Sequence, residues 1–345
     1  MLKNEEIELI RKYLEEAKRP LFFFDDDSDG CCSYLLLKRM YKFGAGIVLK
    51  GRLEEIYIKK VYEYKPDLIV VLDKPIIMQE FLDKNNVPIL WIDHHPLIKR
   101  ENVIYFNPRK WNEIGIPCTT RIVYEIVKNE KDIWLAVVGC IADFDMPPFL
   151  QRYYEIYPDL LEDMKDIETI LFHSKTGELV NIINSCLKGT TSDIRRCLNI
   201  LTKIEDPREI LLEKSARGKY LFNKYLKIRK EYNKLRDKAL KIEPESGMLI
   251  FIYLSLKNSY SAELSTELKY LFPNLFVIVG RKKQEEVIMS LRYQMGGLPL
   301  LLDKALVGVK GYGGGHENAC GAVVSINDYE LFIENLRVEF KKRGE

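Results

Sequence analysis

The first 145 residues alternate short apolar runs with longer amphipathic stretches. Four runs are apolar at consecutive positions: LFFF (21–24), GIVLK (46–50), DLIVVLD (67–73) and PILWID (88–93). Such runs predict strands buried on both faces, as in a parallel sheet. Helical spacing predicts helices at residues 32–43, 54–64, 75–85, 118–128 and 133–144. This order predicts a doubly wound α/β domain with a parallel sheet and helices on both faces.

The pattern changes between about residues 190 and 243. From Lys214 to Lys241 the chain carries eleven Lys and Arg against two acids, although the whole chain has a net charge of only +2. Helical spacing without proline predicts one long connecting helix here. Its cations could follow a phosphate backbone, and its aromatic residues could stack bases. Alternatively, the lysines form a solvated face and the tyrosines belong to a core. The aromatic residues concerned are Tyr220, Phe222, Tyr225 and Tyr232.

From residue 247 onward the α/β pattern resumes. Strands are predicted at 247–255, 274–282 and 285–293, a helix near 259–271, and a glycine-rich loop at 311–321. The predicted organisation is therefore a catalytic domain at 1–185, a helical connector at 186–243 and a smaller α/β domain at 244–345.

Composition narrows the class of protein. Of the 345 residues, 47% are hydrophobic and 30% charged, which is typical of a globular protein with a substantial core. Seven scattered cysteines without a CxxC pair argue against a disulfide framework or a structural zinc site. The first 20 residues predict a mixed-charge amphipathic helix rather than a signal peptide, and no apolar stretch is long enough to span a bilayer. We therefore expect a cytoplasmic protein with no membrane partner.

Acidic residues follow the predicted strands. Four aspartates follow the first strand, Asp73 ends the third, Asp93-His94-His95 ends the fourth, and Asp143 ends a helix; the first group is Asp25, Asp26, Asp27 and Asp29. The carboxyl ends of parallel strands meet at one edge of a sheet. Carboxylates with an imidazole suit Mg²⁺ or Mn²⁺, and a bound dication removes the repulsion between them. A two-metal site is predicted, with Gly30 allowing a tight turn into the next helix. Asp25 and Asp26 are equally compatible with capping that helix.

Read together, these segments resemble the DHH phosphoesterase superfamily. FDDDSDGCCSYLL is similar to the first motif in its RecJ-nuclease form, VVLDKP to the second, WIDHHP to the third and GCIADFDMP to the fourth. GYGGGHENACGAVV resembles the GGGH signature of the DHHA1 domain, and MSLRY resembles the S-x-R strand of that domain. The resemblance covers nearly the whole chain and lies nearest to the compact archaeal RecJ-like proteins.

The resemblance implies a role for each matching position. It implies that Asp73 bridges two ions, that His95 is a catalytic acid/base or hydrogen-bonding residue, and that Asp25 assists. The implied metal ligands are Asp27, Asp29, Asp73, His94 and Asp143. The implied phosphate-binding residues, which the DHHA1 domain would supply, are Ser290, Arg292, Gly313, Gly314, Gly315 and His316. Two positions depart from the family pattern: Phe23 stands where many small-substrate relatives carry a ligating His, and Asp145 is not expected.

The implied function is phosphodiester hydrolysis with two Mn²⁺ or Mg²⁺ ions, most simply as a RecJ-like exonuclease on single-stranded DNA or RNA. One alternative is a phosphodiesterase for short oligoribonucleotides, cyclic dinucleotides or 3′-phosphoadenosine phosphate; chain length favours it and Phe23 disfavours it. A second alternative is a component that accompanies the replicative helicase, although the intact ligand positions argue against a purely non-enzymatic role.

Overall fold

The computed structural model describes residues 1–161 and 166–342. Contacts within the chain divide it into two compact units, Met1–Tyr225 and Leu226–Glu345. The division falls inside the segment predicted as a connector, within the long helix α12 (Ala216–Ala239). The three-part division of the chain stays a prediction.

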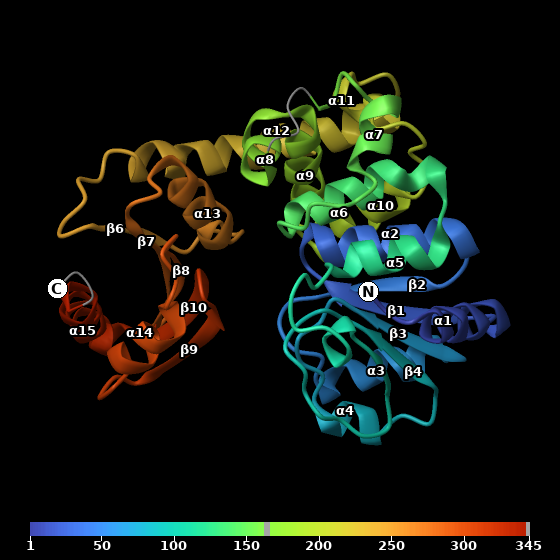
Figure 1. Cartoon of the computed structure of the whole chain (residues 1–345), viewed down its shortest axis with the longest axis horizontal. Coiled ribbons are helices and arrows are strands. Elements are labelled where there is room, and N and C mark those ends of the chain that lie inside the picture. The colour runs from blue at the N-terminus through green and yellow to red at the C-terminus, as the bar shows by residue number, and fades with distance from the viewer. Residues whose placement is uncertain (162–165, 343–345) are drawn as a thin grey trace. The chain divides into compact units, whose positions relative to one another are not determined.

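Unit 1 contains a five-stranded parallel sheet (Figure 1). Its strand order is β2-β1-β3-β4-β5, which is the order of doubly wound flavodoxin-like sheets. The strands are β1 (Pro20–Asp25), β2 (Ala45–Leu49), β3 (Leu68–Leu72), β4 (Ile89–Ile92) and β5 (Ile104–Phe106). The doubly wound fold and four of its strands are confirmed. Strand β5 was not predicted, because it is only three residues long and partly exposed.

Helices cover both faces of this sheet (Figure 1). Phe22 and Phe24 pack in the core beneath one helical layer, whereas Phe23 packs in the core on the opposite face. The three-Phe run is therefore fully buried because successive strand residues point to opposite faces. The first layer contains α1 (Asn4–Glu16), α2 (Ser28–Tyr41), α5 (Thr119–Val127) and α6 (Ile133–Ala142); the second contains α3 (Ile58–Tyr64) and α4 (Gln79–Asp83).

Two helix predictions need correction. The helix expected at 75–85 is only α4, because Ile77 forms a bridge with Leu53 instead of joining a helix. Gly30 does not turn the chain; it lies in the first turn of α2, where an added Cβ would come within 2.7 Å of the Asp25 backbone nitrogen. A side chain is excluded there because helix and strand backbones approach so closely.

Five further helices among the described residues complete unit 1; the first three lie where the sequence pattern assigned no elements, and the last two lie within the segment predicted as a helical connector. The first three pack on α6, the fourth packs on the third, and they bury a continuous apolar core that also takes in Leu221 and Tyr225 of α12. These helices are α7 (Leu150–Ile156), α8 (Ile167–His173), α9 (Lys175–Cys186), α10 (Thr191–Leu201) and α11 (Arg208–Leu211).

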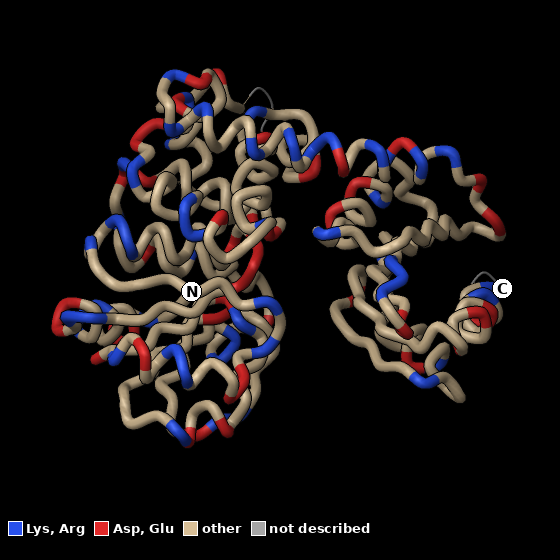
Figure 2. The backbone as a smooth tube through the Cα atoms, turned by 180° about the vertical axis from the view of Figure 1, so that it is seen from behind, with Lys and Arg blue, Asp and Glu red and all other residues tan. Residues whose placement is uncertain are grey.

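The predicted long helix is confirmed as α12, but its aromatic residues face inward. Tyr225 and Tyr232 are buried, and Tyr220 and Phe222 pack against the core of unit 1. Some of its cations are paired, as where Arg229 lies 3.4 Å from Glu263. Basic residues nevertheless recur along the helix in Figure 2. This arrangement favours the second interpretation of the segment, a solvated basic face over a tyrosine-containing core.

Unit 2 contains a mixed five-stranded sheet of order β6-β7-β8-β10-β9, the C-terminal part of α12 and, among its described residues, three further α-helices. The predicted glycine-rich loop is wrong: residues 311–316 and 319–325 are strands β9 and β10, which pair as a hairpin. Glycines form a strand here because β10 supplies the pairing partner, which outweighs their low strand propensity. The elements are β6 (Met248–Leu254), α13 (Ser261–Leu271), β7 (Phe276–Lys283), β8 (Glu286–Arg292), α14 (Leu298–Ala305), β9 (Gly311–His316), β10 (Ala319–Ser325) and α15 (Tyr329–Lys341).

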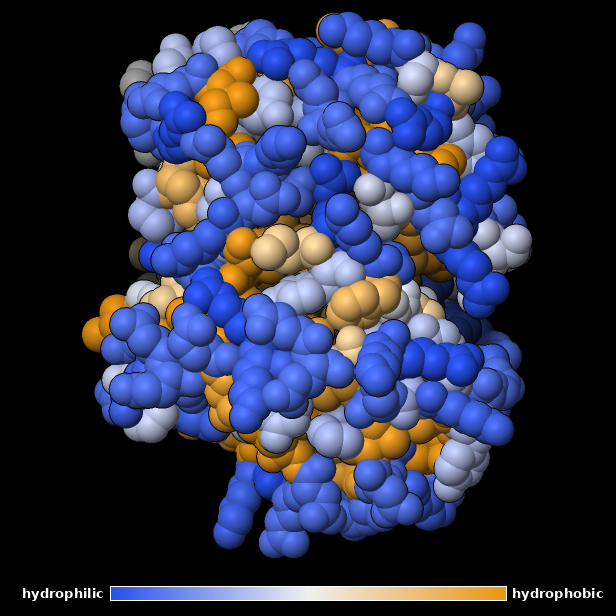
Figure 3. Space-filling view, turned by 90° about the vertical axis from the view of Figure 1, so that its right-hand side faces the viewer, coloured by the Kyte–Doolittle hydropathy of each residue, from blue (hydrophilic) through white to orange (hydrophobic). Residues whose placement is uncertain are grey.

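The described part of the chain has no helix that is both long and apolar enough to cross a membrane. All seven cysteines are free thiols. The face in Figure 3 is mostly hydrophilic, and polar side chains interrupt its apolar areas.

Candidate metal centre

The predicted acidic residues of unit 1 meet at the point where the strand order reverses. Strands β1 and β3 are neighbours, and the chain leaves them toward opposite faces of the sheet, so a crevice opens beyond their carboxyl ends. Asp25 ends β1, Asp73 follows β3, and His94 and His95 follow β4. Asp143 reaches the same place as the C-cap of α6. The fold therefore gathers residues that lie more than a hundred positions apart in sequence.

Three carboxylates surround the imidazole of His94. Its Nε2 lies 3.4 Å from Asp73 Oδ1, 3.7 Å from Asp143 Oδ2 and 3.9 Å from Asp29 Oδ2. Neighbouring ligands of an octahedral ion with bonds of about 2.1 Å are about 3 Å apart. These four side chains thus fit a divalent cation after small rotations, and oxygen with imidazole is the ligand set expected of Mn²⁺.

A second group of ligand atoms overlaps the first. Oxygens of Asp25, Asp27 and Asp73 all lie within 4.8 Å of one another, and Asp73 also groups with His94 and His95. Asp73 is thus common to both groups. The backbone at Asp73 has φ of 58°, which non-glycine residues rarely adopt, and such strain concentrates at functional sites.

The start of α5 holds Asp29 and Asp73 in place. The backbone N–H groups of Thr119 and Thr120 donate to the two carboxylate oxygens of Asp29, at 3.0 and 2.6 Å. The Thr119 hydroxyl donates to Asp73 Oδ1 at 2.9 Å. Helix N-termini stabilise anions through free N–H groups and the helix dipole. Because each carboxylate oxygen has a second lone pair, both aspartates can still bind a cation.

Crowding of the carboxylates changes their acidity. Removal of water and the charges of Asp25 and Asp29 raise the pKa of Asp27 to about 7, although one side of this carboxylate is exposed. Burial and the neighbouring aspartates raise the pKa of Asp73 and of Asp143 well above the usual range. Burial lowers the pKa of His94 and so favours the neutral imidazole that metals bind. A bound dication would relieve the repulsion among these groups.

The Asp93-His94-His95 segment is fixed by residues that follow β5. His95 Nδ1 lies 2.7 Å from Asp93 Oδ1, and Asp93 is fully buried. Burial alone would lower the pKa of His95, but the hydrogen bond and charge of Asp93 raise it. Asn107 Nδ2 donates to the His95 carbonyl at 2.9 Å, and Arg109 Nε donates to the His94 carbonyl at 2.7 Å. Both imidazoles are thereby held in defined positions.

Lys74 is a buried cation at the edge of the cluster. Its Nζ donates to Asp25 Oδ1 at 2.8 Å, and only 2% of the lysine is exposed. The Trp91 indole N–H donates to the Lys74 carbonyl at 2.8 Å, which fixes the Asp73-Lys74 backbone. Phe23 is buried against Phe81 and offers no ligand. The Lys74 ammonium therefore neutralises part of the charge on this side of the cluster.

Asp145, which departs from the family pattern, has a structural position. It accepts from the Cys118 N–H at 3.0 Å and from Arg121 Nη1 at 3.0 Å, so it caps α5 rather than joining the metal ligands. Thr119, Thr120, Lys74, Asn107 and Arg109 were not predicted. The Thr-Thr pair at a helix start carried a usable signal, because free N–H groups are found there. Nothing in the sequence placed the other three beside the cluster.

In unit 2 the predicted phosphate-binding residues lie on neighbouring strands. In the sheet register His316 faces Ala319, which faces Arg292, while Gly314 faces Gly321, which faces Ser290. Residues directly opposite in a sheet share a face, so the side chains of Ser290, Arg292 and His316 border a strip of small residues. A Cβ added to Gly314 would meet nothing within 4 Å, so this strip is open.

The other two predicted glycines serve packing. A Cβ on Gly313 would come within 2.7 Å of Leu302, and one on Gly315 within 2.4 Å of the Ala319 carbonyl oxygen. Arg292 is partly covered; its Nε lies 3.3 Å from the Thr266 hydroxyl, and burial lowers its pKa. Of the three glycines, Gly314 is thus the one at which the surface of this sheet face is open.

Comparison with known proteins agrees with this site. A profile of the DHH family, N-terminal domain, matches residues 21–143, the segment that contains every predicted metal ligand. A search of curated protein sequences finds no match. The chain is similar in fold to RecJ from Thermus thermophilus in complex with Mn²⁺, with a TM-score of 0.70 and 16% identity over 98% of this chain and 54% of that one. It thus spans about half the length of that RecJ.

Two further solved structures are similar. One is exonuclease RecJ bound to manganese, with a TM-score of 0.62 and 15% identity over 98% of this chain and 94% of that one. The other is the DHH domain of a protein described as a member of a family of ribosomal proteins, with a TM-score of 0.69 and 14% identity over 97% and 89% of the two chains. The chain thus shares the fold of these RecJ structures, and the matched family domain contains the carboxylates and imidazoles that could hold divalent cations. Residues 21–143 match the model of the DHH family, N-terminal domain, and the chain has a RecJ-like fold.

Proposed function

We propose that this protein is a RecJ-like exonuclease that hydrolyses phosphodiester bonds of single-stranded DNA or RNA with two Mn²⁺ or Mg²⁺ ions. The observation that carries the proposal is the convergence of His94 with carboxylates from separate elements at the strand-order reversal. His94 Nε2 lies within 4 Å of oxygens of Asp29, Asp73 and Asp143. Asp25 and Asp27 extend the cluster around Asp73, which suits a second ion.

Each group of the site has a proposed role. Bound ions would supply an activated water and stabilise the charge of the leaving oxygen. The amides of α5 hold Asp29, and Arg109 holds the His94 backbone, so the ligands are positioned before a cation arrives. With its Nδ1 hydrogen-bonded to Asp93, His95 can hold and release a proton at Nε2.

The open strip of unit 2 is the proposed phosphate-binding face. Gly314 and Gly321 leave the sheet bare, so a phosphate can approach the backbone closely. Arg292 and Ser290 border this strip from β8, and His316 borders it from β9. A guanidinium grips phosphate through paired hydrogen bonds, which assigns Arg292 the main share of binding.

The second candidate is a phosphodiesterase for short oligonucleotides or cyclic dinucleotides. The inward packing of Tyr225 and Tyr232 favours it, because the connector then presents no stacking track for a long strand. Association with a replicative helicase and a cytoplasmic location stay predictions.

The test is hydrolysis of 20-nucleotide DNA and RNA strands labelled at the 5′ or the 3′ end, with Mn²⁺, Mg²⁺ or EDTA. Stepwise shortening that needs the cation and is lost in Asp29→Asn and His94→Ala is expected, and the label lost first gives the direction. Asp303→Asn, an exposed aspartate in unit 2, is the matched control and should retain full activity.

Two other outcomes discriminate between the candidates. Cleavage of di- to tetranucleotides while 20-mers survive would replace the exonuclease by the small-substrate enzyme. Absence of any cleavage, with Mn²⁺ bound, would refute both.

A further inference from the structure

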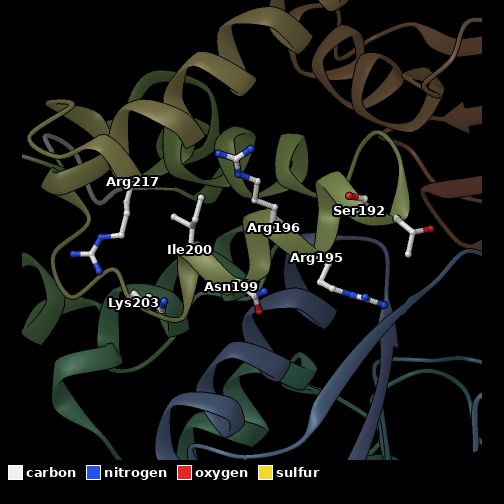
Figure 4. Close-up of a pocket in the computed structure, with 8 residues that line it drawn as sticks. Ser192, Arg195, Arg196, Asn199, Ile200, Lys203 and Arg217 are labelled. Carbon is white, nitrogen blue, oxygen red and sulfur yellow. The ribbon is translucent and has the colours of Figure 1, made fainter. Parts of the chain in front are cut away.

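A groove of about 550 Å³ lies on unit 1 along the outer face of α10, and none of its lining residues belongs to the metal cluster (Figure 4). The helix buries Ile194, Cys197, Leu198 and Leu201 against the core and exposes the opposite side. On that side Thr191, Arg195 and Asn199 lie four residues apart, and Lys203 follows two residues after the end of the helix. Arg196 and, from the start of α12, Arg217 complete a set of four cations.

The charge of this groove is of one sign. Among the described residues that line it there is no acid. The only acidic residue of α10 is Asp193, whose carboxylate accepts from the Thr190 N–H and hydroxyl at the helix start. Across residues 1–161 and 166–342, Arg195 and Lys203 have no ion-pair partner. A merely solvated helix face commonly mixes both charges, so this arrangement favours an anionic ligand.

Two of the cations are held in place. The Arg196 guanidinium lies 4.2 Å above the ring of Tyr220. Arg217 Nε lies 3.3 Å from Glu209, which neutralises part of its charge but fixes its position. Arginines braced in this way lose less side-chain entropy when they bind an anion.

The spread of the cations indicates the shape of the ligand. From Arg195 to Leu201, the last residue of α10, the helix advances about 9 Å at 1.5 Å per residue, and Lys203 lies two residues beyond its end. In Figure 4 the charged ends of the arginines that line the groove lie apart from one another and do not converge on one point. A single phosphate or a compact polyphosphate needs convergent donors, whereas a phosphodiester chain presents charges at intervals.

The helix that carries the groove packs on α9, and α9 contacts the segment that carries Asp27 and Asp29. Ser28, between Asp27 and Asp29, donates to Asn184 of α9 at 2.8 Å, and α10 is the next helix in the chain. We infer that the α10 groove binds the backbone of a single-stranded nucleic acid whose end lies in the metal site. This inference rests on the proposed function and adds to it that the substrate is a long strand, DNA or RNA.

The test uses the full chain and Arg195→Gln/Lys203→Gln. The matched control is Lys12→Gln/Lys59→Gln, which removes the same charge from exposed positions of α1 and α3. Binding of fluorescein-labelled 20-mers, DNA and RNA, is measured by anisotropy in EDTA between 50 and 200 mM salt. Loss of two phosphate contacts lowers the salt slope of a single strand by about 1.4. Over this fourfold salt range, the wild type should therefore lose about sevenfold more affinity than the groove variant.

Hydrolysis of bis(p-nitrophenyl) phosphate with Mn²⁺ reports the metal site alone. We expect it to be equal in wild type and groove variant, while 20-mer binding weakens about tenfold at 50 mM salt in the groove variant only. An unchanged affinity and salt slope would overturn the inference, as would equal weakening in the control pair. Tighter binding of inorganic triphosphate than of the 20-mer at this groove would also overturn it. Failure of the proposed function is distinct: a protein without phosphodiesterase activity would leave the small diester intact in wild type, and a small-substrate enzyme would hydrolyse the diester but leave 20-mers uncleaved.

Discussion

Asp27→Asn should stabilise the metal-free protein and remove its stabilisation by metal. Asp27 is the N-cap of α2, where its side chain accepts from the Gly30 N–H at 2.9 Å. Asparagine caps helices as well as aspartate does, so the substitution keeps the cap and removes only the charge. Because Asp27 lies beside Asp25 and Asp73, the lost charge is a repulsive one.

The magnitude follows from the geometry of the cluster. Two unit charges 4.8 Å apart, the upper limit within this group, repel by about 3.5 kcal/mol at an effective dielectric constant of 20. Asp27 is exposed on one side, so screening by water reduces the expected gain to about 1–2 kcal/mol. In a unit of this size that raises the midpoint of unfolding by about 3–6 °C. Mn²⁺ at a hundred times its Kd should add about 2.7 kcal/mol to the wild type and much less to the variant.

Tryptophan fluorescence is the appropriate assay. All three tryptophans, Trp91, Trp111 and Trp134, lie in unit 1, so their emission follows the unfolding of that unit. Melts at pH 8, above the pKa of about 7 of Asp27, are compared in EDTA and in Mn²⁺. Because folding raises this pKa, the ionised carboxylate costs stability only as pH rises from about 4 toward 7. The advantage of the asparagine variant over wild type should therefore shrink as pH falls through that range.

Asp166→Asn is the matched control, since Asp166 caps α8 through the Thr169 N–H and lies outside the metal cluster. Its melting temperature should stay within about 1 °C of wild type under both conditions. A variant Asp27→Asn that melts below wild type in EDTA would refute the repulsion argument. Undiminished stabilisation by Mn²⁺ would refute the assignment of Asp27 as a ligand.

Three further predictions concern other parts of the structure. Lys74→Met should lower the stability of unit 1 in EDTA by about 2–3 kcal/mol, because it leaves Asp25 without its buried partner. Mn²⁺ should then stabilise the variant more than it stabilises wild type, and equal stabilisation of the two proteins by Mn²⁺ would contradict this. Gly139→Ala should lower the free energy of unfolding by about 1–3 kcal/mol in the same melts, because an added Cβ would come within 2.3 Å of the Thr120 hydroxyl. An unchanged free energy of unfolding would mean that α5 and α6 can move apart at little cost. Gly314→Val should raise KM for nucleic acid, because the valine side chain would enter the open space above this face. The melting temperature of unit 2, followed by far-UV circular dichroism, should not change, since a Cβ at this position meets nothing within 4 Å. An unchanged KM would show that this face is not part of the binding site.

Much of the fold could be predicted from the sequence, because buried strands and helices produce periodic patterns of apolar residues along the chain. The three consecutive Phe residues predicted a strand covered on both faces, and Phe22 and Phe23 do lie in cores on opposite sides of the sheet. The pattern failed at β9, since glycine carries no strand preference and the pairing with β10 decides its conformation. It also missed β5, where three residues are too few for periodicity.

The same division applies to the site. Carboxylates and imidazoles at strand ends are visible in the sequence because each strand end is a local feature, and the order β2-β1-β3-β4-β5 brings these ends together. Sequence could not reveal the Thr119 and Thr120 amides on Asp29 or the Lys74 ammonium on Asp25, because those contacts depend on helix packing and on strand pairing. The chemistry of the ligands was thus determined by residue type and spacing, which act locally. Their orientation and charge balance, and the groove along α10, were decided only by tertiary structure, since they arise between segments distant in the chain.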